Sequence, residues 1–572
     1  MLPGLATVWF IHRYAVNIIY ADQWYDIRII HRFHEGTLGI GDLWAQHGEN
    51  RILIPNLLVL VLASTVHFNI VIEDYLSGVF LAISTGLIVS AHKRRSPSIS
   101  WLYYFPLVIV LLSLNQGGMT LFGFAMSWYL VILGLSAAIF LLDRPDLSWI
   151  GLAGAVLAAV VGSYSSLEGL LIWPVGLLLI YHRMRSRRIW IIWLSSATIV
   201  TALYWYNLNV AKAAIDRGYV LAHPISAVRF FFFAIGNVAG VELPVDPSSW
   251  EYAFLLLGVV IFVIALWVLI KGMPRRGEST GSSIGVALVL FGVLYTVALT
   301  GARAGFGLPV LPRYAIFDLL ILAGCYLYLL DSSIVAARQD HSSLGSRAVS
   351  TASSIGKVSI RSRIKTRCAG SLSQVEHFGV WVALIGVICV QASVGTYEAL
   401  RAAGRWRTQE TMIADIEVNI DRAPDAMVES QLGSGYEPAG FIRQMTSVAR
   451  SQRLSLFSTS GVLVYAREGL PGSKVPPLTR VLQPATGANL RGNQWLVAYA
   501  WDSFGVTKVE FEFQTQGGPA TIIGRAAQSP VGWLGGWNTS TIPNGTYTLR
   551  SVATDSSGLV TSSSGVVVTV KN

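Results

Sequence analysis

The first 395 residues alternate between long apolar runs and short polar segments. Several runs approach the roughly 20 residues with which a helix crosses a bilayer. The pattern therefore predicts a mainly α protein, a polytopic transmembrane bundle of about eleven helices. The expected spans are 2–20, 70–91, 101–115, 118–142, 147–163, 168–182, 189–207, 251–270, 283–300, 314–330 and 377–395.

The pattern changes after residue 396. Segment 396–484 begins as a helical stretch and becomes loop-rich, with Pro476-Pro477 in an expected linker near 467–485. From 485 onward the period is two: Trp495, Val497, Tyr499 and Trp501 alternate with small or polar residues, and Val509, Phe511 and Phe513 do the same. Alternating strands with turn signals predict an all-β sandwich over 485–572, immunoglobulin-like in size. The expected domains are 1–395, 396–484 and 485–572.

The tryptophans of this sandwich allow two interpretations. Exposed rings could stack on sugars, which would make the domain a carbohydrate-binding module, whereas buried rings would belong to its core. The alternation favours the core for Trp495 and Trp501. The glycines around Trp533 and Trp537 favour an exposed loop.

Composition agrees with a membrane protein. The chain has 572 residues, of which 53% are hydrophobic and 13% charged, and its mean hydropathy is +0.54. Soluble domains carry roughly twice that share of charge. The net charge of +10 comes from short basic runs beside the spans, which indicate topology and not nucleic-acid binding. Three cysteines, Cys325, Cys368 and Cys389, provide neither a disulfide framework nor a cysteine metal site.

The basic runs also predict sidedness. Lys93-Arg94-Arg95, Arg183 to Arg188, Lys271 to Arg276 and loop 332–375 all follow apolar runs and are expected in the cytoplasm. The alternate loops, and everything after 396, would then lie outside the cell (inner) membrane. A span at 52–68 would place Lys93-Arg94-Arg95 on the outer face of the membrane. Residues 43–66 are therefore expected to form a helix along the outer surface.

The expected outer loops hold the candidate chemistry. Residues 21–51 are dense in acids, bases and aromatic rings, unlike the runs around them. Such density beside apolar spans is typical of a wet, reactive cleft at a membrane face. Arginine at the outer end of a span usually has an anionic partner, and its planar fork suits phosphate oxygens. The outer loops contribute Asp22, Trp24, Asp26, His47, Glu49, Arg51, Asn115, Gln116, Glu168, Arg303, Arg313 and Tyr314.

Acids, rim arginines and apolar walls together suggest a polyprenyl-phosphate substrate. Transfer of a sugar from such a lipid needs a base for the acceptor hydroxyl. It needs no second acid, because the leaving group is already a phosphate anion. Glycoside hydrolysis differs, since two acids flank the bond there.

Four segments resemble bacterial polytopic glycosyltransferases of the GT-C superfamily. They are Asp22-Gln23-Trp24 after the first span, Leu43-Trp44 through Arg51, Ser163 through Gly169 with Trp173-Pro174, and Arg303 through Tyr314. The resemblance covers roughly residues 1–465. It implies an outer active site, a lipid-linked sugar donor and an acidic residue in the first outer loop as catalytic base.

Carried onto this chain, the resemblance makes Asp22 the catalytic base, with Asp26 the next candidate and Glu49 the third. Arg303 and Arg313 match the arginines on the phosphate side. Family members often carry two consecutive acids before the tryptophan, where this chain has Asp22-Gln23. A divalent cation, Mg²⁺ or Mn²⁺, is therefore left open as a cofactor. The expected substrate contacts are Trp24, His47, Glu49, Arg51, Asn115, Gln116, Glu168, Arg303, Arg313 and Tyr314.

The expected function is inverting sugar transfer from a polyprenyl-phosphate donor to a glycan, lipid or protein of the cell envelope, on the extracytoplasmic face. Membrane lipid is an expected partner and nucleic acid is not. The alternative is a transporter or flippase of a lipid-linked sugar, which needs charged or broken helices at midplane; His12-Arg13 in the first span keeps it open. A third reading, a silent anchor for an adhesive sandwich, leaves the acids and arginines unexplained.

Overall fold

The computed structural model divides the chain into two compact units. The helical unit comprises Met1–Asn17 and Ile29–Thr408, and the second unit comprises Ile18–Arg28 and Gln409–Asn572. The structure describes residues 2–572 except 184, 210–217, 240–247, 273–282, 309, 311, 351–377, 398, 401–402, 404–412, 415, 422, 424, 434–436, 459–475, 502–505, 516, 530–531 and 556–557.

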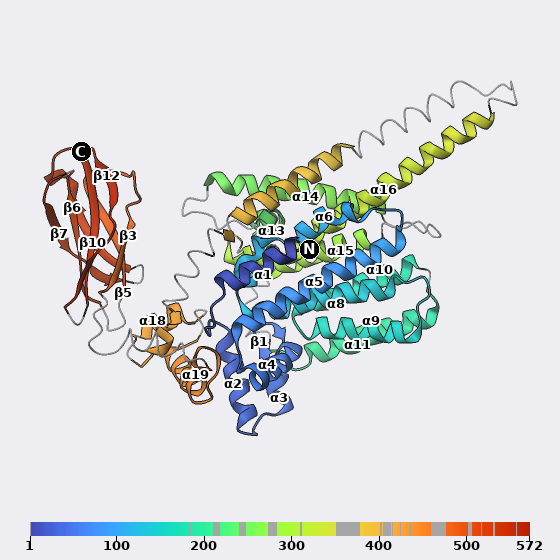
Figure 1. Cartoon of the computed structure of the whole chain (residues 1–572), viewed down its shortest axis with the longest axis horizontal. Helices are drawn as coiled ribbons and strands as arrows, with labels where there is room; N and C mark the ends of the chain where they lie inside the picture. The colour runs from blue at the N-terminus through green and yellow to red at the C-terminus, as the bar shows by residue number, and fades with distance from the viewer. Residues whose placement is uncertain are drawn as a thin grey trace. The chain divides into compact units, whose positions relative to one another are not determined.

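Helices dominate the helical unit, as the apolar runs predicted (Figure 1). Eight of its described helices are long and apolar enough to cross a membrane, consistent with a membrane protein. Its described α-helices and one small hairpin are α1 (Leu2–Tyr14), α2 (Gln23–His34, which begins in the second unit), α3 (Ile40–Leu43), β1 (Gln46–His47), β2 (Asn50–Arg51), α4 (Leu53–Val66), α5 (Ile70–Arg95), α6 (Phe105–Leu111), α7 (Gly117–Thr120), α8 (Met126–Leu142), α9 (Trp149–Ser163), α10 (Ile172–His182), α11 (Arg187–Trp205), α12 (Tyr219–Ala222), α13 (Pro224–Gly236), α14 (Ser248–Gly272), α15 (Ser283–Arg303), α16 (Ala315–Ser350) and a helix at Phe378–Tyr397.

Eight of the eleven expected spans coincide with these long apolar helices, and the other three fall on shorter helical segments. Helix α1 ends at Tyr14 and not near residue 20, and α9 has 15 residues. The helical segment Leu167–His182, which ends with α10, covers the expected 168–182 but is also short for a span. At 1.5 Å per residue, a helix of 15 residues is only about 22 Å long. These three segments lack the length on which the count of eleven depended.

Three other expectations are corrected by the helix boundaries. The helix expected over 43–66 is interrupted, because the hairpin of β1 and β2 precedes α4. The expected outer loop 207–250 contains the apolar helix α13, whose Phe230 and Phe233 are buried in the main core. Helix α16 runs to Ser350, into the expected loop 332–375; the part of that loop after residue 350 lies outside the described residues.

Paired glycines allow the long helices to pack closely. A side chain on Gly285 of α15 would lie 2.6 Å from the carbonyl oxygen of Gly324 on α16, and one on Gly324 would collide with Gly285 in turn. Gly236 of α13 and Gly258 of α14 meet in the same reciprocal way. Small residues at both sides of a crossing let backbones approach, a common device between membrane helices.

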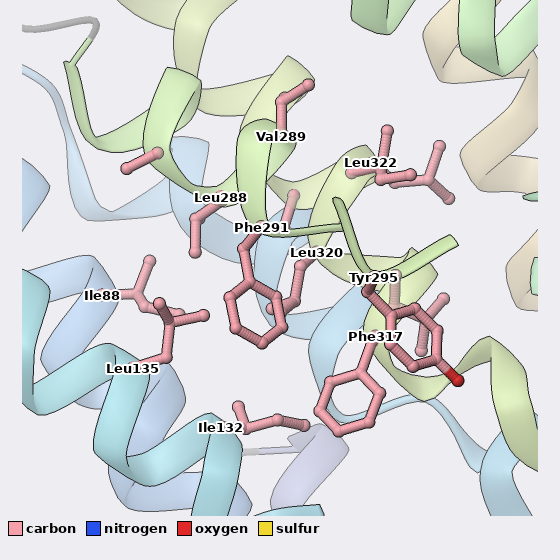
Figure 2. Close-up of a cluster of buried hydrophobic side chains, with 14 of the residues drawn as sticks. Ile88, Ile132, Leu135, Leu288, Val289, Phe291, Tyr295, Phe317, Leu320 and Leu322 are labelled. Carbon is pink, nitrogen blue, oxygen red and sulfur yellow. The ribbon is translucent and has the colours of Figure 1, made fainter. Parts of the chain in front are cut away.

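A continuous apolar core joins α5, α8, α15 and α16. Figure 2 shows its centre, where the rings of Phe291 and Tyr295 from α15 lie beside Phe317 from α16. The two rings nearest each other, Tyr295 and Phe317, have centroids 4.6 Å apart. The Tyr295 hydroxyl also donates to the carbonyl of Tyr314 at 3.0 Å, which ties α15 to the segment just before α16.

In the second unit, the segment Ile18–Arg28 packs against residues about four hundred positions away. The backbone N–H of Ala21 and the indole N–H of Trp24 both donate to the carbonyl of Leu432, at 2.8 and 2.9 Å. The ring of Tyr25 lies 5.3 Å from that of Phe441 on α19 (Ala439–Ser451). Helix α18 (Asp425–Gln431) precedes Leu432.

The C-terminal part of the second unit contains two sheets, as expected for a sandwich. One sheet has the order β4-β12-β10-β6-β7, with β11 paired to β10, and the other has the order β3-β5-β9-β8. Strand β3 starts at Leu478, ahead of the expected boundary at 485. The strands are β3 (Leu478–Gln483), β4 (Asn489–Leu490), β5 (Asn493–Trp501), β6 (Val506–Gln514), β7 (Ala520–Arg525), β8 (Ala527–Ser529), β9 (Gly532–Asn538), β10 (Gly545–Asp555), β11 (Val560–Ser562) and β12 (Val566–Val570).

The expected core position of Trp495 on β5 was wrong, although Val497 of the same set is buried. Leu496 and Ala498 face the core and are fully buried, whereas Trp495 is 70% exposed. Trp537, expected in an exposed loop, is 4% exposed and stacks on Phe513 within the core. Period two identifies a strand, and which set of residues faces inward depends on the opposite sheet. The side chain of Trp501 lies outside the described residues.

Candidate functional site

A two-residue hairpin in the helical unit presents Glu49. Strands β1 and β2 pair His47 with Asn50, so Gly48 and Glu49 form the turn. Gly48 has a φ of +55°, a left-handed conformation that suits glycine and that tight hairpin turns require. The sequence Gly48-Glu49 thus places a carboxylate at the tip of the hairpin.

Arg51 holds this hairpin in position. Its guanidinium donates to the carbonyls of Trp44, Tyr206 and Tyr204, at 2.6, 2.7 and 3.3 Å, and only 4% of the residue is exposed. Its backbone N–H donates to the Tyr204 hydroxyl at 3.1 Å, and that hydroxyl donates to the carbonyl of Glu49 at 3.1 Å. Arg51 was predicted to contact substrate, and its contacts give it a positioning role.

Glu49 forms an ion pair with Arg303 at the end of α15. The two side chains are 16% and 15% exposed, so the pair is largely removed from water. Arg303 also lies over the ring of Phe306, with its Cζ 5.7 Å from the centroid, and beside the side chain of Tyr314. A partly buried guanidinium with aromatic walls is suited to binding an anion.

Glu168 adds a second carboxylate to the cluster. It accepts a hydrogen bond from Ser166 and lies close enough to Glu49 and Arg303 to interact with both charges. Asn50 connects this loop to the hairpin, because its Oδ1 accepts from the backbone N–H of Leu167 at 2.9 Å. Glu49, Glu168, Arg303 and Tyr314, from three distant segments, therefore form one polar cluster at the ends of apolar helices; we call it the Arg303 cluster.

Aromatic rings form one wall beside the hairpin. The rings of Trp44 and Tyr164 are 5.0 Å apart, and Tyr164 stacks on Tyr204 at 6.4 Å. Tyr204 and Asn50 were not predicted as site residues. Asn50 lay inside the polar stretch 21–51, whereas Tyr204 lies at the end of an apolar run and gave no signal in the sequence.

Of the other predicted residues, His47 and Arg313 lie beside the Arg303 cluster, and the rest lie elsewhere. His47 packs its ring against Phe124 at 5.0 Å, and Arg313 lies over the ring of Tyr314. Asn115 is 5% exposed and donates to the carbonyl of Val238, and Gln116 beside it is 4% exposed. Asp22, Trp24 and Asp26 belong to the second unit, where Trp24 and Asp26 are buried.

A metal site was left open by the sequence. Among the described residues, no group of three or more His, Cys, Asp or Glu side chains is arranged to hold a metal ion.

The family that the chain matches lies in the sandwich. Residues 477–550 match the family of bacterial Ig domains, which agrees with the two sheets and supports an Ig-like domain. No curated protein matches the chain. Among solved structures, the endo-beta-1,4-mannanase from Thermotoga petrophila matches with 14% identity over 23% of this chain and 24% of that chain, and the TM-score is 0.15. The matched part spans about a quarter of the mannanase chain, and such a TM-score does not indicate a shared fold.

Proposed function

We propose that the chain is a membrane glycosyltransferase that moves a sugar from a polyprenyl-phosphate donor to a glycan, lipid or protein acceptor of the cell envelope. The observation that carries the proposal is the Arg303 cluster. A largely buried cation, two carboxylates and aromatic walls gather where apolar helices end. A donor of this kind joins a charged phosphate to a long apolar chain, and the cluster offers a partner for the phosphate next to the apolar helices.

The proposed chemistry is a single displacement. The acceptor oxygen attacks the anomeric carbon of the donor sugar and gives its proton to a carboxylate. The bond from the anomeric carbon to the phosphate oxygen breaks, and the polyprenyl phosphate leaves with the electron pair. Arg303 stabilises the leaving phosphate, which carries more negative charge in the transition state than in the donor. Such a displacement inverts the anomeric centre.

Three carboxylates compete for the role of base. The GT-C resemblance assigns it to Asp22, with Asp26 next, and the proposal retains that order. Glu49, third in order, forms an ion pair with Arg303. In the resting protein Glu49 occupies Arg303, so donor phosphate must share or displace this contact.

The transporter reading has one observation in its favour. Glu73 and Asp74 lie in the first turns of α5, a candidate span, and each is 1% exposed. Ionisable residues within membrane helices often mark a substrate or ion pathway. A lipid-linked sugar flippase is therefore the second candidate function, and these two acids would be its first residues to test.

The test is sugar transfer from a synthetic polyprenyl-phosphate sugar in nanodiscs, with donor binding measured in parallel. Arg303→Gln should weaken donor binding by about one to two orders of magnitude, as expected for loss of a charge-assisted contact. The matched control is Arg32→Gln, which removes one charge from the more exposed pair with Asp42. Unchanged donor binding by Arg303→Gln would contradict the proposed site. Movement of the lipid across proteoliposomes without any transfer would favour the flippase.

A further inference from the structure

Five arginines gather at the opposite end of the helical unit's long helices. Arg94 and Arg95 end α5, Arg144 follows α8, and Arg183 and Arg185 follow α10. Asp143 lies at their centre and is fully buried. The charges of Asp143 and Asp146 face those of the five guanidinium groups, which leaves an excess of three positive charges. We call this group the Asp143 cluster.

The Asp143 cluster is a separate site from the Arg303 cluster. Ser283 at the start of α15 contacts the carboxylate of Asp143 at 3.5 Å, and Arg303 is the last residue of the same helix. A helix of 21 residues is roughly 30 Å long, which is also about the thickness of the hydrocarbon core of a bilayer. The two clusters therefore lie at the two ends of one membrane-length helix.

Arg95, Arg183 and Arg185 hold the ends of three helices together. Arg95 donates to the Asp143 carboxylate at 2.7 Å, and Arg183 reaches it at 3.2 Å. Arg185 donates to the carbonyls of Leu142 and Pro145, at 3.1 and 2.9 Å, where the last carbonyls of α8 need donors. These side chains tie the ends of α5 and α10 to the end of α8.

Arg94 and Arg144 differ from the other three. Both guanidinium groups stand over the ring of Phe140, with Cζ atoms 4.7 and 5.1 Å from its centroid. Arg94 donates to the carbonyl of Phe140 at 2.8 Å. Its Nε, like those of Arg183 and Arg185, is buried with no hydrogen-bond partner among the described residues. Within the described part of the chain, neither Arg94 nor Arg144 forms an ion pair with a carboxylate. One ring thus holds two like charges close together, an arrangement that an anion bound to both would stabilise.

The surroundings indicate where that anion comes from. Trp101 and Trp149, which begin the helical segments after α5 and α8, are 63% and 61% exposed. Exposed tryptophans at helix ends are typical of the interface where lipid headgroups lie. Basic pockets between membrane helices at that depth bind anionic headgroups. We propose that Arg94 and Arg144, held over Phe140, bind a phosphate group, with anionic lipid as its source and free phosphate as the competing source.

The experiment measures bound lipid by native mass spectrometry on the full-length protein titrated with phosphatidylglycerol. The double variant Arg94→Gln/Arg144→Gln should bind the first lipid roughly thirtyfold more weakly, a factor of about five for each arginine. The control Arg187→Gln/Arg188→Gln removes the same charge from exposed residues at the start of α11 and should change binding much less. Arg94→Lys/Arg144→Lys keeps the charge and should retain part of the affinity. This comparison separates loss of charge from loss of fold.

A second arm titrates the same proteins with inorganic phosphate and follows thermal unfolding in detergent. Stabilisation by phosphatidylglycerol alone supports the lipid source, and equal stabilisation by inorganic phosphate at equal concentration would assign the site to a free anion. The proposal is overturned if the Gln double variant binds phosphatidylglycerol like the wild type. It is also overturned if the Arg187/Arg188 control loses as much affinity.

Discussion

The acids of residues 21–51 divide between the two units, and their surroundings differ. Glu49 lies in the helical unit, at the tip of a hairpin, paired with Arg303 and near Glu168. Asp22 and Asp26 lie in the second unit, in a segment that Trp24 ties to Leu432. Glu49 therefore lies in a cluster of charged side chains. Asp22 and Asp26 lie in a segment that is held by structural hydrogen bonds. A stretch that is continuous in sequence thus takes part in two structural neighbourhoods.

The sharpest test of this difference is the effect of each acid on transfer. Asp22→Asn should lower turnover by about 10²–10⁴-fold with donor binding nearly unchanged, because the amide cannot accept a full proton. Glu49→Gln should keep most turnover and bind donor more tightly, since Arg303 would lose its resting partner. Transfer from a synthetic lipid-linked sugar measures both. The reverse pattern would make Glu49 the base and leave Asp22 with a structural role.

Substitutions in the sandwich should lower the stability of the second unit and leave the rate of sugar transfer unchanged. Trp537→Ala should destabilise the sandwich by about 3–5 kcal/mol, because a buried indole leaves a cavity. Trp495→Ala is its matched control; it removes the same ring from an exposed position and should cost less than about 0.5 kcal/mol. Unfolding followed by tryptophan fluorescence distinguishes the two. Equal losses would show that the face assignment of β5 is wrong.

Burial of Glu417 provides a test of how Ile18–Arg28 is held. Glu417 accepts from the backbone N–H of Ile19 at 3.3 Å, and burial raises its pKa from 4.5 to about 8. The folded state therefore keeps the proton that the unfolded state loses. The contribution of protonated Glu417 to the stability of the folded state is complete below pH 4.5, and it is lost as the pH rises toward 8. Glu417→Gln should remove this pH dependence and stabilise the segment by a few kcal/mol at pH 9.

Hydrogen exchange of residues 18–28 between pH 5 and 9, corrected for the intrinsic pH dependence of exchange, measures this effect. The control is Glu429→Gln, which changes a carboxylate that accepts from the N–H of Ala439 at 2.9 Å in the same unit. An unchanged pH dependence in Glu417→Gln would contradict the assignment.

The smallest effect is expected from removing the sandwich altogether. A chain ending at residue 476 lacks every strand from β3 onward and keeps the Arg303 cluster and the segment Ile18–Arg28. Its turnover with a small acceptor should stay within about twofold of the wild type, because the truncation removes none of the proposed catalytic residues. Domains with their own cores commonly fold independently. Loss of turnover in a well-folded truncated protein would place part of the active site in the sandwich.

The sequence predicted the long helices well because apolar length is a local property. Eight expected spans coincide with long apolar helices, and the alternation of Val509 and Phe511 correctly marked a buried face. Helix α13 was missed because it follows a polar segment and is only 13 residues long. The lengths of α1 and α9 were overestimated for a related reason, since hydropathy records where a run is apolar and not where its helix ends.

Residue types and spacing alone determined a helical bundle with apolar helices, a C-terminal sandwich of alternating strands, and a set of outer-loop acids and arginines as candidate chemistry. Only the tertiary structure decided which of these charges meet. It paired Glu49 with Arg303, gave Arg51 to backbone carbonyls and placed Asp22 in another unit. The physical reason is range: helix and strand patterns arise within a few residues, whereas ion pairs between distant segments depend on how the helices pack.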